Sequence, residues 1–241
     1  MRDTLYVSKV NEVYARVNSE PSIAQELCDQ LTFTVPGAKF IPAVRNKFWD
    51  GKIRLYNTLT GLVYFGLIDE VKNFADMREY LIEIDDQCLP ANTQLTDKQI
   101  YDFFISLNLT LKPRDYQINA IKHGIKNDRC LFLSPTSSGK SLIIYLLTRF
   151  YNLRTLIIVP TTSLVSQLYT DFQDYGYDSE QYVHKIYGGA DKSINKLVTV
   201  STWQSIYKLP KSFFDQFDVV IGDEAHLFKA KSLTTVMEKL V

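Results

Sequence analysis

Two hydrophobic patterns divide the chain. In the first ninety residues, short stretches that alternate apolar and polar side chains, such as NEVYARV (11–17), are typical of half-buried strands. IRLYN (53–57), LVYFG (62–66) and LIEID (81–85) are further strand candidates. PSIAQELCDQL (21–31) and LIDEVKNFADMREY (67–80) place apolar residues at helical spacing. The pattern predicts a small α+β domain over residues 1–90.

A second pattern begins near residue 129. CLFLS (130–134), TLIIVP (155–160), KLVTVST (196–202) and DVVIGDE (218–224) are nearly continuous apolar runs with helical stretches between them. Buried strands that alternate with helices predict an α/β domain whose central parallel sheet is covered by helices on both faces. Ligands bind such sheets at the carboxyl ends of the strands.

The two patterns are joined by a polar segment. CLPANTQLTDK (88–98) contains a proline and few apolar residues, which is typical of a linker. QIYDFFISLN (99–108) then predicts a connecting helix. We therefore expect a linker and connecting helix over 91–112, followed by the second domain over 113–241.

Composition narrows the class of protein. Hydrophobic residues make up 46% of the 241, and the 27 lysines and arginines balance the 27 acids, which argues against a uniformly basic nucleic-acid coat. The three cysteines lack zinc-ligand spacing, and their sparse number predicts reduced thiols in a cytoplasmic protein. No apolar stretch has the length of a membrane span or the character of a signal peptide.

The stretch SPTSSGKS (134–141) carries the first chemical signal. Its GKS ending, between a predicted strand and a predicted helix, is the context of a phosphate-binding P-loop, although Ser134 stands where the general pattern has glycine. Lys140 would reach the β- and γ-phosphates of a nucleotide, and Ser141 would ligate Mg²⁺. A chance GKS in a serine-rich loop is the alternative.

IGDEAH (221–226) carries the second signal, because two carboxylates follow a buried strand. Asp223 would hold Mg²⁺, directly or through water, and Glu224 would act as the base that polarises the attacking water. The alternative is a helix cap followed by a solvated acidic pair.

Read in order, PRDYQ, SPTSSGKS, IVPTTSLVSQ, YGGA, VSTWQS and DEAH resemble the first RecA-like lobe of superfamily-two helicases, over about residues 110–241. The resemblance implies ATP and Mg²⁺ as cofactors, Gln117 as the reader of adenine with Arg114 nearby, and His226 as the residue that couples the nucleotide site to a second lobe. It also places the nucleotide on the loop residues Pro135, Thr136, Ser137, Ser138, Gly139, Lys140 and Ser141. Ser137 departs from the family, which often has glycine there, so a positive φ at Ser137 would mean local strain.

The same resemblance implies nucleic-acid contacts at Thr161, Thr162, Gly188, Gly189, Thr202 and Trp203. Small hydroxyl residues and glycine N–H groups can contact a phosphate backbone without reading its sequence. Helix caps, a turn and, for Trp203, core packing are the alternatives.

Residues 37–56 (GAKFIPAVRNKFWDGKIRLY) combine cations with aromatic rings. The cations Arg45, Lys47, Lys52 and Arg54 predict nucleic-acid contacts. For Phe48 and Trp49 we expect core packing instead.

FWDGKIRL (48–55), together with the following LVYFGLIDEV (62–71), resembles the N-terminal domain of the UvsW helicases of T-even phages. This resemblance implies an ATP-dependent DNA helicase that moves 3′ to 5′ on branched recombination and fork intermediates. Branched or single-stranded DNA, and RNA within R-loops, are then the expected partners, and the host cytoplasm the expected location of a phage-encoded protein.

The resemblance further implies a second RecA-like lobe, which supplies an arginine finger and is absent from these 241 residues. The expectation is therefore a fragment of a longer polypeptide that binds nucleotide weakly and turns over little ATP. An RNA helicase and a non-catalytic nucleic-acid-binding module stay open as alternatives. A small-molecule kinase is disfavoured, because 133 residues precede the loop and the DEAH stretch has no place there.

Overall fold

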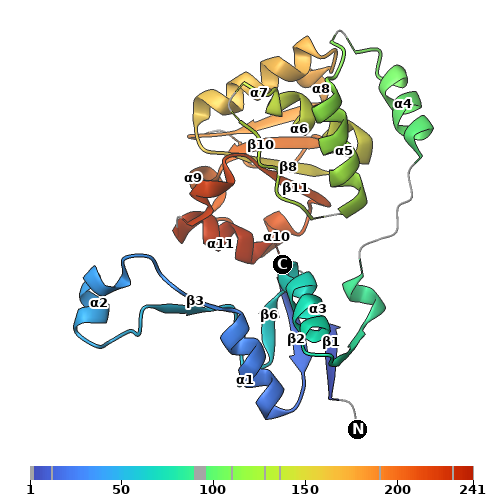
Figure 1. Cartoon of the computed structure of the whole chain (residues 1–241). Helices are drawn as coiled ribbons and strands as arrows, with labels where there is room; N and C mark the ends of the chain where they lie inside the picture. Colours follow the sequence, from blue (N-terminus) through green and yellow to red (C-terminus); the bar gives the residue numbers. More distant parts are fainter. Residues whose placement is uncertain are drawn as a thin grey trace. The chain divides into compact units, whose positions relative to one another are not determined.

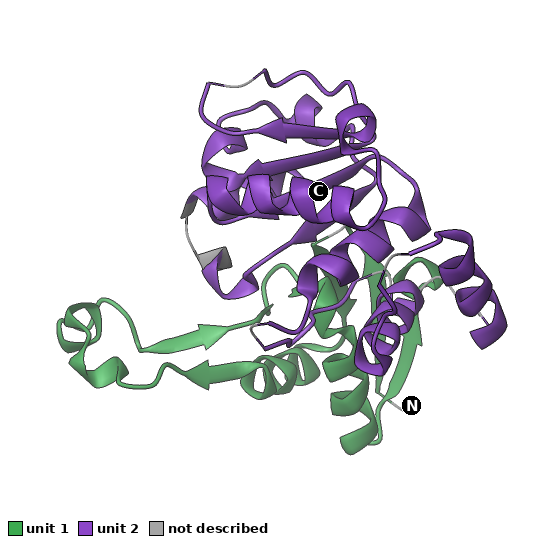
Figure 2. Ribbon diagram, turned by 90° about the horizontal axis from the view of Figure 1, so that it is seen from above, with its two compact units in different colours: residues 1–90, 241 green, residues 91–240 purple. Residues whose placement is uncertain are grey.

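The computed structural model describes residues 3–11, 13–89, 96–109, 111–127, 129–135, 137–189, 191–229 and 231–240. The chain forms two compact units, residues 1–90 and residues 91–240, coloured green and purple in Figure 2. None of the helices in these ranges has the length and hydrophobicity that crossing a lipid bilayer requires.

A five-stranded mixed sheet forms the centre of the first unit. The strand order is β5-β6-β2-β1-β7; β1 is antiparallel to β2 and parallel to β7. The strand β1, which the alternation pattern did not single out, lies beside the predicted strands. The bounds are β1 Thr4–Lys9, β2 Tyr14–Asn18, β5 Tyr56–Asn57, β6 Leu62–Tyr64 and β7 Leu81–Ile84.

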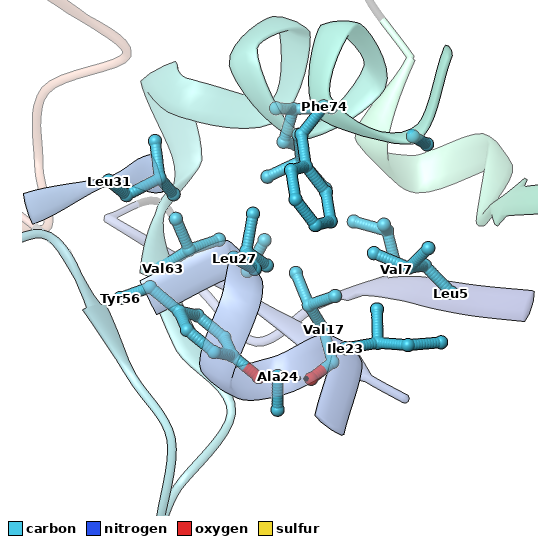
Figure 3. Packing of buried hydrophobic residues seen from close by; sticks show 14 of the residues in the cluster. Leu5, Val7, Val17, Ile23, Ala24, Leu27, Leu31, Tyr56, Val63 and Phe74 are labelled. Atoms are coloured by element: carbon cyan, nitrogen blue, oxygen red, sulfur yellow. Dashed lines mark hydrogen bonds between the residues drawn. The ribbon is translucent and has the colours of Figure 1, made fainter. Parts of the chain in front are cut away.

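Two helices cover one face of this sheet, α1 (Pro21–Gln30) and α3 (Ile68–Met77). Their apolar stripes meet the inward-facing residues of the strands, and Figure 3 shows Leu27 and Phe74 pointing toward Val17. The buried Tyr56 hydroxyl is satisfied by a 3.2 Å hydrogen bond to the Val17 carbonyl oxygen. The helices expected over 21–31 and 67–80 are thus confirmed, and their burial follows from spacing at i, i+3 and i+4.

An arm of the first unit runs from β3 (Thr32–Thr34) to β4 (Lys52–Arg54) and projects from the rest of that unit in Figures 1 and 2. The two strands are antiparallel, and the tip carries the short helices η1 (Ala38–Phe40) and α2 (Pro42–Arg45). The expectation that Phe48 and Trp49 pack in the core is wrong. Phe48 is 84% exposed and Trp49 is half-buried, and neither belongs to the core cluster, because both lie on the arm between α2 and β4.

The second unit is built on a four-stranded parallel sheet in the order β11-β8-β10-β9. Every residue of β8 and β10 is buried, as expected for strands covered on both faces. The bounds are β8 Thr155–Val159, β9 Val183–Ile186, β10 Val198–Thr202 and β11 Val219–Gly222. The parallel sheet and three of its strands are therefore as predicted, and β9 is an addition.

Helices lie on both faces of this sheet (Figure 1). Along β8, Ile157 and Val159 pack in one cluster with α5, α6 and α7, whereas Leu156 and Ile158 pack in the other with α9, α10 and α11. The helix bounds are α4 Asp97–Ser106, α5 Asp115–Asn127, α6 Lys140–Tyr151, α7 Thr162–Asp174, α8 Ser179–Tyr182, α9 Trp203–Ile206, α10 Lys211–Phe214, η4 Ala225–Lys229 and α11 Lys231–Lys239.

The strand predicted over residues 130–134 does not form. Within the described residues no strand pairs with this segment, and the side chains of Leu131 and Leu133 are 64% and 91% exposed. An apolar run predicts burial, but a strand also needs a neighbour whose backbone accepts and donates its hydrogen bonds. The four strands described in this unit pair only with one another. The loop after residue 134 therefore does not extend from a strand of the sheet, and other contacts hold it.

Candidate functional site

The GKS loop has two left-handed backbone positions. Ser137 has φ of 62° and Gly139 has φ of 74°, and α6 begins directly afterwards at Lys140. Backbone turns of this kind group N–H donors around a concave anion-binding site, and the N–H groups of a helix N-terminus add to it. Thr136, predicted to bind nucleotide, lies outside the described residues. The observed loop geometry fits a phosphate-binding role.

Ser137, which stands where the family often has glycine, has the positive φ that indicates local strain. A non-glycine residue in the left-handed region is strained by roughly 1–2 kcal/mol, so the surrounding contacts must hold it. The neighbouring Ser138 supplies them: its hydroxyl lies 2.6 Å from the Ser134 hydroxyl, and its carbonyl oxygen accepts two hydrogen bonds from α5. The loop is strained at Ser137 and held in place by its flanks.

Gln117 holds the loop from the side. Its side chain is buried, and its Nε2 donates to the carbonyl oxygens of Ser138 (3.0 Å) and Gly139 (3.3 Å). Its Oε1 accepts from the Arg114 N–H at 2.9 Å. Both amide atoms are thus engaged within the protein. This loop-holding contact was not predicted from the sequence, and adenine reading by Gln117 stays a prediction that requires one of these bonds to exchange.

Alanine at position 139 is expected to weaken ADP binding by this chain at least about tenfold, or 1.4 kcal/mol. A Cβ there would overlap the Gln117 Nε2 atom and would also occupy a left-handed φ. The measurement is titration with a fluorescent ADP analogue. Gly37→Ala is the matched control: it has nearly the same φ, 73°, but its Cβ would meet nothing closer than 4.0 Å. Equal affinities of Gly139→Ala and wild type would contradict the prediction.

The acidic pair at the end of β11 contacts the loop. Lys140 Nζ lies 3.3 Å from Glu224 Oε1, and His226 Nδ1 lies 3.2 Å from Glu224 Oε2. Glu224 has φ of 54°, and its N–H donates to Asp223 Oδ1 at 2.9 Å. The sharp turn thus places the Glu224 carboxylate between the loop lysine and His226. Residues 84 positions apart meet here, as the sequence predicted for a P-loop and its acidic partner.

The Ser141 hydroxyl has partners that the sequence did not reveal. It lies 3.0 Å from the Tyr175 hydroxyl. Burial raises the pKa of the neighbouring Asp171, and the Ser141 hydroxyl partly offsets this rise. Burial likewise raises the pKa of Tyr175. Among the described residues no hydrogen bond joins Ser141 to Asp223, and no three His, Cys, Asp or Glu side chains form a cluster that could hold a metal ion. Mg²⁺ ligation by these two residues therefore stays a prediction that requires Ser141 to change partners.

A pocket of about 580 Å³ adjoins the loop. Arg114 and Tyr116 line it from the start of α5, and Ser137 and Ser138 line it from the loop. Its remaining walls are mostly apolar, including Phe132. An apolar pocket with a few polar groups beside a phosphate cradle can take the base and ribose of a nucleotide.

A second pocket, of about 650 Å³, opens at the carboxyl ends of β8, β9 and β10. Four of the predicted nucleic-acid residues, Thr161, Thr162, Gly188 and Thr202, line this pocket. Thr161 also caps α7, because its hydroxyl oxygen accepts from the Leu164 N–H at 3.3 Å. The cap and the binding role are compatible, since the hydroxyl is exposed.

Two predicted residues do not line this second pocket. Trp203 is only 8% exposed and packs in a core cluster with Leu156 and Ile158, which favours the core alternative. Gly189 is likewise not among the lining residues. The pocket adds Gln204 and Ser205, which stand in the VSTWQS stretch, and Lys192, Tyr207 and Lys208, which no motif indicated. Lys192 lies in the segment after β9, and Tyr207 and Lys208 follow α9, where the sequence shows no motif.

All four predicted cations of the arm, Arg45, Lys47, Lys52 and Arg54, are exposed. The Arg54 guanidinium donates a hydrogen bond to the Asp50 carboxylate. This hydrogen bond lowers the pKa of Asp50. Phe40 and Phe48 are 73% and 84% exposed beside these cations. Exposed rings and cations together suit unpaired bases and their phosphates.

Comparisons with known proteins agree with this geometry. A family model described as type III restriction enzyme, res subunit, matches residues 110–241, and one described as DNA helicase UvsW, N-terminal, matches residues 7–85. The chain is 38% identical over 242 residues to the ATP-dependent DNA helicase uvsW of Enterobacteria phage T4, covering 94% of this chain and 47% of that protein. It is 25% identical over 178 residues to the DNA 3'-5' translocase XPB2 of Sulfurisphaera tokodaii, covering 74% and 36%.

Solved structures extend the agreement to the whole fold. Two crystal structures of T4 UvsW superpose with TM-scores of 0.85 and 0.87 at 35% identity, each covering 98% of this chain and, respectively, 88% and 50% of the other chain. The predicted fold class, an α/β RecA-like lobe preceded by a small α+β domain, is confirmed. The chain spans about half the length or less of the curated relatives it matches.

Proposed function

This chain belongs to the family of the type III restriction enzyme res subunit, with an N-terminal domain of the UvsW helicase type, and from that premise we propose that it is the ATP-binding part of a DNA helicase or translocase. The contact that carries the proposal is the 3.3 Å approach of Lys140 to Glu224, because it brings a phosphate-binding loop and a catalytic carboxylate together. The two curated relatives are a DNA helicase and a DNA translocase, which favours DNA as the substrate.

In this proposal the loop binds the phosphates of ATP. The N–H groups around Ser137 and Gly139 and the ammonium of Lys140 hold the phosphate oxygens, and the apolar pocket beside Arg114 takes the base. Ser141 and Asp223 would hold Mg²⁺, which neutralises charge on the phosphates when it is bound. Binding must break the ion pair between Lys140 and Glu224, which leaves the Glu224 carboxylate available to orient water.

A second RecA-like lobe in the same polypeptide completes the site in this proposal. The chain covers 47% of the T4 helicase, which leaves room for such a lobe in a protein of that size. An arginine from that lobe would stabilise the transition state, an effect of about 10³–10⁵ in related phosphoryl transfers. His226, which is 71% exposed and lies 3.2 Å from Glu224, would couple the carboxylate to that lobe. The chain by itself is then expected to bind nucleotide weakly and to hydrolyse little.

The DNA strand would lie across the second pocket. Thr161, Thr162 and Thr202 present hydroxyls, and Gly188 a backbone N–H, to phosphate oxygens. Contacts of this kind hold a backbone without reading bases, so they do not separate DNA from RNA. An RNA helicase is thus the alternative that the same pocket would support, and a non-catalytic binding module is the alternative if hydrolysis is absent.

The direct test is ATP hydrolysis and strand separation by a polypeptide that carries this chain together with its second lobe. We expect stimulation by forked DNA, Holliday junctions and R-loops to exceed that by linear DNA and by matched RNA, with movement 3′ to 5′. Preference for RNA would favour the RNA helicase, and absence of hydrolysis on every substrate would leave the binding module. Such a protein, if phage-encoded, would work in the host cytoplasm.

The exposed cations of the arm give a prediction for DNA binding. Replacing Arg45 and Lys52 with alanine is expected to weaken binding of forked DNA and to reduce the slope of log K against log salt by about 1.4–1.8. The reason is that each cation that binds a phosphate releases counterions from the DNA, so a variant with two fewer cations releases fewer of them. Titrations at several salt concentrations measure the slope. Replacing Lys72 and Arg78, which face other acids of the same unit, removes equal charge and should leave the slope unchanged.

A further inference from the structure

We propose that the Tyr116 hydroxyl is a positioning group for the phosphate-binding loop. It fixes the peptide between Ser138 and Gly139 so that the N–H of that peptide faces bound phosphates. The inference rests on the proposed nucleotide site and assigns a role to a side chain of the PRDYQ stretch for which the motif indicated none. Tyr116 lies at the start of α5, 22 positions before the peptide it holds.

The contact is a chain of hydrogen bonds with a fixed direction. The Tyr116 hydroxyl donates to the Ser138 carbonyl oxygen at 2.9 Å, and Arg114 Nη1 donates to the same hydroxyl at 3.3 Å. A guanidinium can only donate and a carbonyl can only accept, so the hydroxyl proton must point at Ser138. The Gln117 amide donates to the same carbonyl at 3.0 Å. Both lone pairs of that oxygen are therefore used, and the peptide is held by two side chains.

The planar geometry of the peptide links the direction of the Ser138 carbonyl to that of the Gly139 N–H group. In a trans peptide the C=O and the following N–H point in opposite directions. Because the Ser138 carbonyl is drawn toward α5, the Gly139 N–H is directed away from α5. Gly139 is the residue before the first turn of α6, whose N–H groups have no partner within the helix. Holding the carbonyl thus adds one N–H to the donors that face an anion at the helix start.

The rest of the loop makes this anchor important. The segment before it, residues 129–135, has no strand pairing within the described residues, and Ser137 holds a strained φ of 62°. A loop that is strained and lacks a strand on one side relies on its side-chain contacts to keep one conformation. The two donors to Ser138, together with the 3.3 Å bond from Gln117 to the Gly139 carbonyl oxygen, connect the loop to α5.

A different role for Tyr116 is contact with the base, since its ring lines the pocket beside the loop. The two roles make different demands on the ligand. A hydroxyl that shapes the phosphate cradle affects every ligand that carries phosphates, whereas a base contact affects only ligands that carry a base. Tripolyphosphate, which has no base or ribose, therefore separates them.

The test is Tyr116→Phe in this chain, which removes the hydroxyl and keeps the ring. Binding of a fluorescent ADP analogue and its displacement by tripolyphosphate are measured for wild type and variant. We expect both affinities to fall by a similar factor, about threefold to tenfold, as for the loss of one hydrogen bond whose acceptor keeps a second donor. Tyr101→Phe, an exposed tyrosine on α4, is the control and should change neither affinity.

Two outcomes overturn the proposal. If ADP binding weakens and tripolyphosphate binding does not, the hydroxyl serves the base. If neither changes, the Gln117 amide alone is enough to hold the peptide. Failure of the wild-type chain to bind ADP or tripolyphosphate would instead contradict the proposed nucleotide site itself. Thermal unfolding of the variant, expected to match the wild type within a few degrees, separates a local effect from loss of the fold.

Discussion

Replacing Lys140 with alanine is expected to weaken ADP binding by this chain about 10- to 100-fold. The ammonium at the start of α6 would make charge-assisted hydrogen bonds to phosphate oxygens, and each such bond contributes about 1.5–3 kcal/mol. Its removal also leaves the Glu224 carboxylate, 3.3 Å away in the present structure, without a cation beside incoming phosphates. In a polypeptide that includes the second lobe, we expect hydrolysis to fall by about 10²- to 10³-fold.

Two variants make this result specific. Lys98→Ala removes an equal charge from an exposed position on α4 and should leave both measurements unchanged. Lys140→Arg keeps the charge but replaces a compact ammonium with a planar fork, so we expect an intermediate affinity. Hydrolysis or unwinding that survives Lys140→Ala at the wild-type rate would rule out the motor that we propose.

Elements with a strong pattern could be predicted from the sequence. The spacing of Ile23, Leu27 and Leu31 predicted α1, and the apolar runs predicted β8, β10 and β11 of the parallel sheet. These elements are determined by local periodicity together with the need to bury one face, and both properties are visible in a single sequence. The meeting of Lys140 and Glu224 was expected from two strand ends at one edge of the sheet, and half of that reasoning holds: the acidic pair follows β11, whereas the loop follows residues 130–134, which form no strand.

What could not be predicted depends on partners distant in the chain. CLFLS has the composition of a buried strand, yet a strand forms only where a neighbouring edge is free to pair with it. Phe48 has the composition of a core residue, yet it lies on a projecting arm. The Ser141 hydroxyl contacts that of Tyr175, which lies 34 positions later in the chain, directly after α7. No motif marks that tyrosine. In each case the tertiary neighbour, rather than the residue type, decides the outcome.

Gln117 and Tyr116 show a further limit. PRDYQ directs attention to a residue that reads adenine, but the structure engages the Gln117 amide with the backbone of the loop. A sequence motif marks residues that a site needs without saying which neighbour they contact. Tyr116 stands within the same motif, and only the 2.9 Å bond to Ser138 indicates its role.

Replacing Glu224 with glutamine is expected to separate nucleotide binding from hydrolysis. Glutamine has the same size and the same backbone requirement at φ of 54°, so the turn after β11 should be kept. It cannot accept a proton as a carboxylate does, and loss of a general base lowers the rate by about 10²- to 10⁴-fold. ADP affinity should stay equal or rise, because Lys140 no longer has to leave an anionic partner at 3.3 Å before it meets phosphate.

Hydrolysis is measured in the polypeptide with its second lobe, and ADP affinity in this chain. Glu238→Gln, at an exposed position on α11, is the control for loss of one carboxylate. If binding and hydrolysis fall together in Glu224→Gln, the carboxylate acts mainly by holding Lys140 and the loop, since a pure base would affect the chemical step alone. If neither falls, another group orients the water. If the hydrolysis rate falls while ADP affinity is unchanged, Glu224 is the general base, because only the chemical step then depends on its carboxylate. The same result shows that the ion pair between Glu224 and Lys140 is not needed for nucleotide binding.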